Sequence, residues 1–91
     1  MDKRDARFYY EGGKSLKEKV NVAVGGMLWL EKVIYDEERT SSARKDARKE
    51  WNRLENHKNV ILEHYNKIEA QLRNEHSEFL TDLRSGFRFD E

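Results

Sequence analysis

The sequence predicts an all-α protein: a helical hairpin or small bundle with one long C-terminal helix. Three observations lead to this fold class. The 91 residues include no proline, so no position is obliged to break a helix. Alanine, glutamate, lysine, leucine and arginine make up close to half of the chain, as is typical of long helices and coiled coils. Apolar residues also recur at spacings of three and four along two long stretches.

The first 14 residues are expected to form a polar leader outside the helical domain, which spans residues 15–86. Phe8, Tyr9 and Tyr10 stand in a row in this leader, and three consecutive aromatics suit a short extended segment. Gly12 and Gly13 then indicate a turn or loop before the first predicted helix.

The first helix is predicted over residues 15–39. Ser15 and Glu18 have the spacing of a capping box, in which each side chain accepts the other residue's backbone N–H. The densest apolar stretch of the chain, residues 20–35, follows with helical spacing. Gly25-Gly26 leaves a β-hairpin turn open as an alternative. The helix is favoured because the capping box and the apolar stripe agree, and the two glycines would then admit a closely packed neighbour.

The second helix is predicted over residues 43–85, after a polar joint at residues 40–42. Its apolar stripe has the spacing of a coiled-coil seam. The helix propensity of residues 56–59 is poor, so a break there and a three-helix bundle remain an alternative. Gly86 is expected to end the helix, with Phe87 folding back toward Leu83 and residues 87–91 forming a short tail.

The lengths of the two predicted helices favour oligomerisation. The first is roughly 38 Å long and the second roughly 65 Å at 1.5 Å per residue, so a simple hairpin leaves the end of the second helix uncovered. We therefore expect a homo-oligomer, most simply a dimer, that completes the bundle. The expected interface residues are apolar residues that the hairpin leaves uncovered, on the far side of the first helix and at the end of the second: Leu30, Val33, Leu72, Phe79, Leu80 and Leu83.

Known catalytic and metal-binding patterns are missing from the sequence. There is no cysteine, so disulfides and thiolate metal sites are excluded. No nucleophile elbow or phosphate-binding glycine loop occurs. The three histidines, His57, His64 and His76, match no metal-binding spacing. The expectation is a protein that is not an enzyme and binds neither metal nor cofactor.

The chain also lacks the features of a secreted or membrane protein. Charged residues form 40% of the sequence, against about 25% in an average domain. Residues 1–13 contain no apolar signal-peptide core, and the apolar stretch is shorter than the roughly 20 residues that a membrane-spanning helix needs. We therefore expect a soluble, cytoplasmic protein.

The function that these features favour is binding to another protein, as an adaptor, inhibitor or assembly factor. Aromatic residues and arginine are the usual anchors of such interfaces. The candidate contacts are the aromatic residues that a hairpin leaves uncovered: Phe8, Tyr9, Tyr10, Trp29, Phe87 and Phe89.

Nucleic-acid binding is the alternative function. Five basic residues recur with helical spacing near Trp51, and such a face can meet phosphates: Arg44, Lys45, Arg48, Lys49 and Arg53. Asp46, Glu50 and Glu55 dilute this face, and the pI of 6.8 is far below that of a typical nucleic-acid-binding domain.

Overall fold

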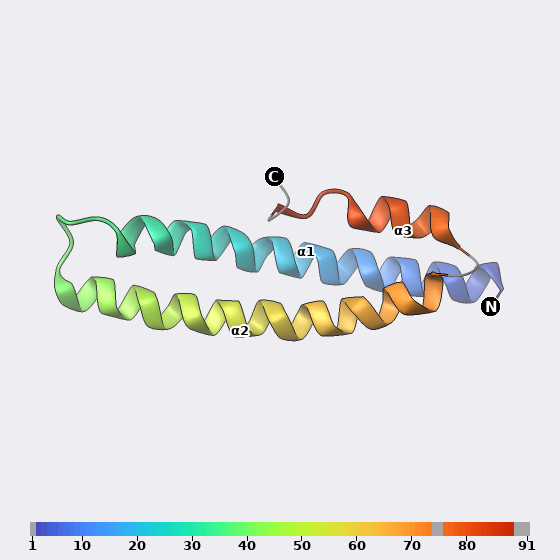
Figure 1. The fold of residues 1–91 in the computed structure, drawn as a ribbon, viewed down its shortest axis with the longest axis horizontal. Helices are drawn as coiled ribbons and strands as arrows, with labels where there is room; N and C mark the ends of the chain where they lie inside the picture. The colour runs from blue at the N-terminus through green and yellow to red at the C-terminus, as the bar shows by residue number, and fades with distance from the viewer. Residues whose placement is uncertain (1, 74–75, 89–91) are drawn as a thin grey trace.

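A computed structural model describes residues 2–73 and 76–88 of the chain. It contains three helices: α1 (Lys3–Ile34), α2 (Ser41–Leu72) and α3 (Ser77–Arg84). Helices α1 and α2 form an antiparallel hairpin, and the short α3 folds back along it (Figure 1). The molecule measures 56 × 21 × 15 Å, and its radius of gyration of 16.7 Å exceeds the roughly 12 Å of a compact domain of this length. The predicted all-α hairpin is confirmed.

Helix α1 begins much earlier than the sequence indicated. Asp2 is its N-cap, and the Asp2 carboxylate accepts the backbone N–H of Asp5 at 2.9 Å. The predicted extended leader is therefore wrong, and the Ser15 capping box lies inside the helix. Ala6 and Gly13 are buried in the core, so tertiary packing outweighs the poor helix propensity of the glycines.

The Gly25-Gly26 pair lies within α1, so the alternative of a hairpin turn is wrong. A glycine at position 26 allows α1 and α2 to pack closely, because a Cβ there would lie only 3.0 Å from Leu54 Cδ1 of α2. Helix α1 also ends earlier than residue 39. Its last carbonyl, that of Ile34, accepts Nε–H of Arg44 at 2.9 Å, and residues 36–40 form the connection to α2.

Helix α2 begins beside its N-cap Thr40, whose hydroxyl accepts the backbone N–H of Ala43 at 3.1 Å. It continues through residues 56–59, so a break there is wrong. The single helix predicted over residues 43–85 is instead divided: α2 ends at Leu72, and α3 starts at Ser77. The reversal brings the apolar face of α3 onto the hairpin, whereas a straight helix would leave that face in water.

Two apolar clusters hold the fold together. The larger cluster lies where all three helices meet, and its buried members are Ala6, Val20, Val24, Ile61, Tyr65, Leu72, Leu80, Leu83 and Phe87. The smaller lies near the loop between α1 and α2, and its buried members are Leu30, Val33, Ile34 and Ala47. Because α3 covers only one half of the hairpin, the other half is two helices thick (Figure 1). None of the described helices has the length and apolar composition that crossing a bilayer requires.

Candidate functional site

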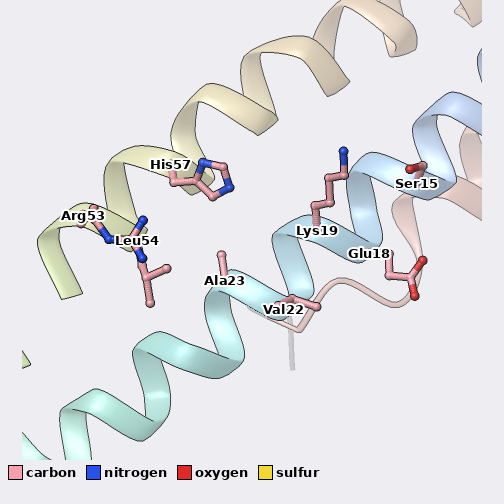
Figure 2. A pocket seen from close by; sticks show the side chains of 8 residues that line it. All are labelled: Ser15, Glu18, Lys19, Val22, Ala23, Arg53, Leu54 and His57. Atoms are coloured by element: carbon pink, nitrogen blue, oxygen red, sulfur yellow. The ribbon is translucent and has the colours of Figure 1, made fainter. Parts of the chain in front are cut away.

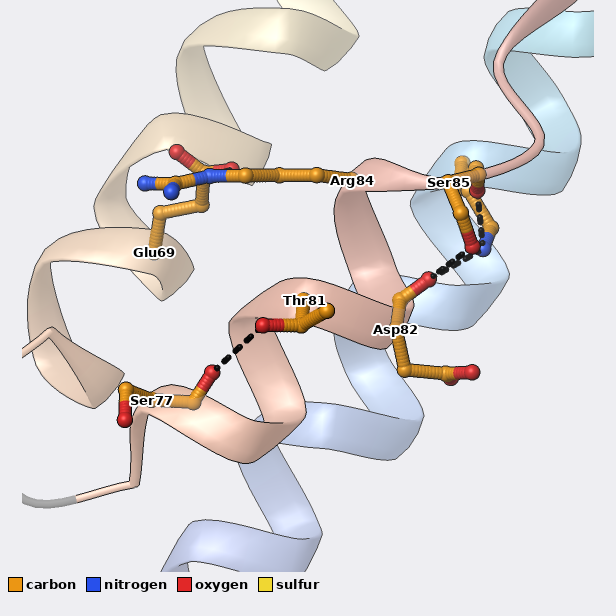
Figure 3. Close-up of polar contacts among 7 residues, drawn as sticks. Glu69, Ser77, Thr81, Asp82, Arg84 and Ser85 are labelled. Atoms are coloured by element: carbon orange, nitrogen blue, oxygen red, sulfur yellow. Dashed lines mark hydrogen bonds and ion pairs between the residues drawn. The ribbon is translucent and has the colours of Figure 1, made fainter.

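Helix α3 is attached to α1 by a row of polar side chains at helical spacing. The Tyr10 hydroxyl donates to the Asp82 carboxylate, and Lys17 Nζ donates to the Ser85 carbonyl at 3.0 Å. Arg84 reaches from α3 to α2, where its Nε lies 3.1 Å from Glu69 Oε1 (Figure 3). These contacts fix the position of α3 along the hairpin.

The apolar side of α3 fits closely against the hairpin. Leu83 is fully buried, and a Cβ at Gly13 would lie 3.0 and 3.1 Å from its two methyl groups. Gly86, which was expected to end the helix, directly follows the C-cap residue Ser85 and has a left-handed backbone conformation, with φ of 81°. This turn places the Phe87 ring edge-on to the Tyr65 ring, with centroids 5.1 Å apart.

The proposed oligomer interface is largely covered by the chain itself. Leu72, Leu80 and Leu83 are buried where α3 meets the hairpin, and Phe79 is partly buried in a stack on Tyr10. Leu30 and Val33 lie in the smaller core cluster with residues of α2. The expectation of a bare stripe at the end of the second helix is therefore wrong. Self-association itself remains a prediction, and it needs a different surface.

The six candidate partner contacts fall into separate environments. Phe8 and Trp29 are exposed, by 76% and 62% of their surface. Tyr9 and Tyr10 are half-buried beside the larger cluster, and Phe87 is buried within it. The remaining candidate, Phe89, lies outside the described residues.

Trp29 belongs to an open groove on the two-helix half of the molecule. The groove has a volume of about 700 Å³, and we name it the aromatic groove; it is lined by Gly25, Leu28, Trp29, Glu31, Lys32, Tyr35 and Arg88. Leu28 and Tyr35 are also exposed, by 47% and 76%. Sequence reasoning missed both, because their spacing matches the stripe that is buried elsewhere in α1. On this side of α1, Lys17 and Asn21 contact Ser85 and Gly86, and the described part of the chain after α3 reaches only as far as Gly25.

Arg88 reaches the aromatic groove through a clamp made by Asn21. The Asn21 side chain donates to the Gly86 carbonyl at 2.9 Å and accepts the backbone N–H of Arg88 at 2.8 Å. The Arg88 guanidinium then lies over Gly25, where a Cβ would come within 2.6 Å of Nη1. Gly25 therefore leaves the space that the guanidinium occupies.

A second groove, of about 460 Å³, lies between α1 and α2. Figure 2 shows Ala23 of α1 pointing toward α2, where Leu54 lies, and Val22 also lines the groove. Its other lining residues are polar or charged, among them Lys19, Arg53 and His57, and neither tryptophan nor tyrosine lines it.

The five basic residues suggested for nucleic acid do not form one free surface. Arg44 is half-buried against the end of α1, and Arg53 pairs with Glu50, both of whose carboxylate oxygens lie 3.0 Å from its Nε. Arg53 is exposed, as are the other three: Lys45, Arg48 and Lys49. Trp51 is half-buried, and its indole N–H donates to Glu31 at 3.3 Å, so the ring is not presented for stacking on a base.

Titratable groups in the described residues do not gather into a metal site, since no three histidine or carboxylate side chains come together there. One buried polar group is unusual. The Tyr65 hydroxyl is buried without a hydrogen bond of good geometry among the described residues. Burial, and then the nearby Glu69 carboxylate, raise the pKa of Tyr65 well above the ordinary value of 10.0.

No protein-family model matches the chain, and neither curated proteins nor solved structures yield a match.

Proposed function

We propose that this chain is a non-catalytic protein-binding module whose partner docks in the aromatic groove of α1. The observation that carries the proposal is the exposure of Trp29 with Leu28 and Tyr35 beside it on one helix. Adjoining exposed apolar side chains mark interaction surfaces, because each loses the free energy that burial would provide.

The composition of the groove also suits a protein partner. Tryptophan, tyrosine and arginine are the residues that most often dominate binding free energy at interfaces, and the groove contains Trp29, Tyr35 and Arg88. The residues that face it stand on a helix already fixed by the smaller core cluster, so binding needs little ordering of the backbone.

A second copy of the chain is the other protein that the groove could bind. The homo-oligomer expected from the sequence would use Trp29 in place of the buried leucines of α3. Partner binding and self-association would then compete for the same surface. Light scattering of wild-type protein and of Trp29→Ala distinguishes the two, because a dimer formed through the groove becomes a monomer in the variant.

The experiment that tests the proposed function uses Trp29 as a reporter. Trp51→Phe leaves Trp29 as the single tryptophan of the chain. Peptides are selected from a displayed random library against this protein. We expect selected peptides to shift the Trp29 fluorescence to shorter wavelength, and Trp29→Ala in the wild-type background to lose their binding.

The matched control is Val60→Ala, which removes an exposed apolar side chain of α2 that does not line the groove. It should leave peptide affinity unchanged. Peptide binding that survives both Trp29→Ala and Tyr35→Ala would contradict the proposed function. A salt-sensitive gel shift of an oligonucleotide that is lost in Arg48→Ala would favour the nucleic-acid alternative instead.

A further inference from the structure

We propose that two copies of this chain bind each other by exchanging helix α3. In the exchanged pair, α2 and α3 of each chain form one continuous helix, and α3 of one copy packs on the α1–α2 hairpin of the other. This inference does not involve the aromatic groove and goes beyond the proposed function. It follows from the backbone at the reversal between α2 and α3 and from the contacts that hold α3.

The backbone of α2 keeps a helical pattern into the reversal. Its C-cap, Arg73, has φ of −56° and ψ of −42°, which are helical values. The backbone N–H of His76 donates to the Leu72 carbonyl at 3.1 Å, which is the spacing of an α-helical hydrogen bond. His76, the N-cap of α3, then has φ of −137° and ψ of 50°. Of the described residues between α2 and α3, only His76 departs from helical dihedrals.

The sequence of the reversal does not require a turn. Residues 73–76 are Arg-Asn-Glu-His, with neither glycine nor proline, and the apolar spacing predicted a single helix through them. Helix α3 has only eight residues, and the side chain of its N-cap makes no capping hydrogen bond to it. In a continuous helix, the first N–H groups of α3 would donate to carbonyls of the preceding turn, and these bonds offset part of the entropy lost on association.

The contacts of α3 with the hairpin can form within one chain or between two. Leu83 is fully buried, and its methyl groups lie 3.0 and 3.1 Å from the position of a Cβ at Gly13. Arg84 Nε lies 3.1 Å from Glu69 Oε1 of α2. Because each contact joins α3 to the hairpin, α3 of a second copy can make the same contacts. Two intact hairpins need another surface to associate, whereas exchange uses the covered surface itself.

The protein concentration decides between the single chain and the exchanged pair. In the single chain, α3 is tethered to its own hairpin at an effective concentration of the order of mM. The exchanged pair should therefore form as the protein approaches this concentration, and at lower concentration when the continuous helix is favoured. Conversion requires α3 to leave the hairpin and expose Leu80 and Leu83, so we expect refolding at high concentration to trap the pair.

The first test changes the helix propensity of the reversal. His76→Ala and His76→Gly both remove the imidazole and its contacts, but alanine favours a helix over glycine by about fivefold at one position. An exchanged pair contains this position in both chains, so its association constant should be roughly 25-fold larger for His76→Ala than for His76→Gly. Each variant is refolded over a range of concentrations, and light scattering after size-exclusion chromatography gives the fraction of pairs.

The matched controls for this test are His64→Ala and His64→Gly. His64 is exposed within α2, in a segment that is helical in both the single chain and the exchanged pair. Alanine and glycine at this position should therefore differ in stability but not in the fraction of pairs.

The second test shows whether α3 itself is exchanged. Glu69→Arg and Arg84→Glu each replace the ion pair between α2 and α3 by two like charges. When the two variants are refolded together, exchange restores opposite charges on both hairpins, because each hairpin receives α3 of the other variant. Native mass spectrometry of the mixture at low salt should then find mixed pairs in excess of random association. Glu50→Arg mixed with Arg53→Glu is the control, because this ion pair lies within α2 and should give random association.

The outcomes that overturn the inference are distinct. The mass of a single chain at every concentration, for wild type and for His76→Ala, overturns it. Equal fractions of pairs in His76→Ala and His76→Gly overturn it, as do mixed pairs at the random level, because the chains would then associate through another surface. A pair that is lost in Trp29→Ala has its interface in the aromatic groove and also overturns exchange of α3. Peptide binding at that groove is measured separately, so the proposed function can fail without affecting this inference.

Discussion

Replacing Gly13 and Gly12 separately with alanine measures how tightly α3 packs on the hairpin. Both glycines lie inside α1, so each alanine gains about 1 kcal/mol of helix propensity. Their surroundings differ. A Cβ at Gly12 would make an ordinary contact of 3.4 Å with Ile68 Cδ1. A Cβ at Gly13 would meet both methyl groups of Leu83, at 3.0 and 3.1 Å.

The expected result is opposite in the two variants. Gly12→Ala should stabilise the protein by about 0.5–1 kcal/mol, because the propensity gain meets no steric opposition. In Gly13→Ala, fully buried Leu83 cannot rotate away, so α3 must shift, and overpacking of this kind costs about 1–3 kcal/mol. We therefore expect Gly13→Ala to be less stable than Gly12→Ala by roughly 1–3 kcal/mol.

The assay is urea unfolding followed by circular dichroism at the wavelength of helix absorption. A double-mutant cycle adds a direct control, because Leu83→Ala removes the methyl groups that oppose the new side chain. In that background Gly13→Ala should become stabilising. Equal stabilisation by Gly12→Ala and Gly13→Ala in the wild-type background would refute the packing of α3 against this part of α1.

Other predictions follow from single contacts. Leu83→Ala should destabilise the protein by about 2–5 kcal/mol in urea unfolding, because it empties a fully buried site. Thr40→Ala should cost about 1 kcal/mol through loss of the α2 N-cap, whereas Ser41→Ala, one residue later, should have little effect. Above pH 10 the unfolded chain releases the Tyr65 proton before the folded chain does, since the folded pKa is raised; stability should therefore fall by up to about 1.4 kcal/mol per pH unit there, with no such loss below pH 10. The measurement is the urea midpoint between pH 8 and 11. Tyr65→Phe should remove this loss of stability, whereas Tyr35→Phe, at an exposed site, should not. If Tyr65→Phe and wild type lost stability equally at alkaline pH, the loss could not be assigned to Tyr65.

The helical class and several local features could be predicted from the amino-acid sequence. The absence of proline and the apolar spacing of three and four predicted two long helices with a joint at residues 40–42, where Thr40 proves to be an N-cap. Gly86 was predicted to end the last helix, and it directly follows the C-cap residue Ser85 with a positive φ. These features depend on residues that are close to one another in the sequence. The spacing of apolar residues and the helix propensity of each residue describe such local relations.

Which apolar residues are covered could not be predicted, because it depends on how the helices pack against one another. A helical period shows that Leu28, Leu80 and Leu83 lie on apolar faces, but not which faces meet. Because the chain reverses between α2 and α3, Leu80 and Leu83 of α3 are buried. Leu28 of α1 stays exposed, because α3 does not extend far enough along the hairpin to cover it. The candidate site therefore depends on contacts between residues far apart in sequence, such as that of Asn21 with Arg88. The helix ends were predicted from local preferences, which are weak compared with the free energy of packing between helices.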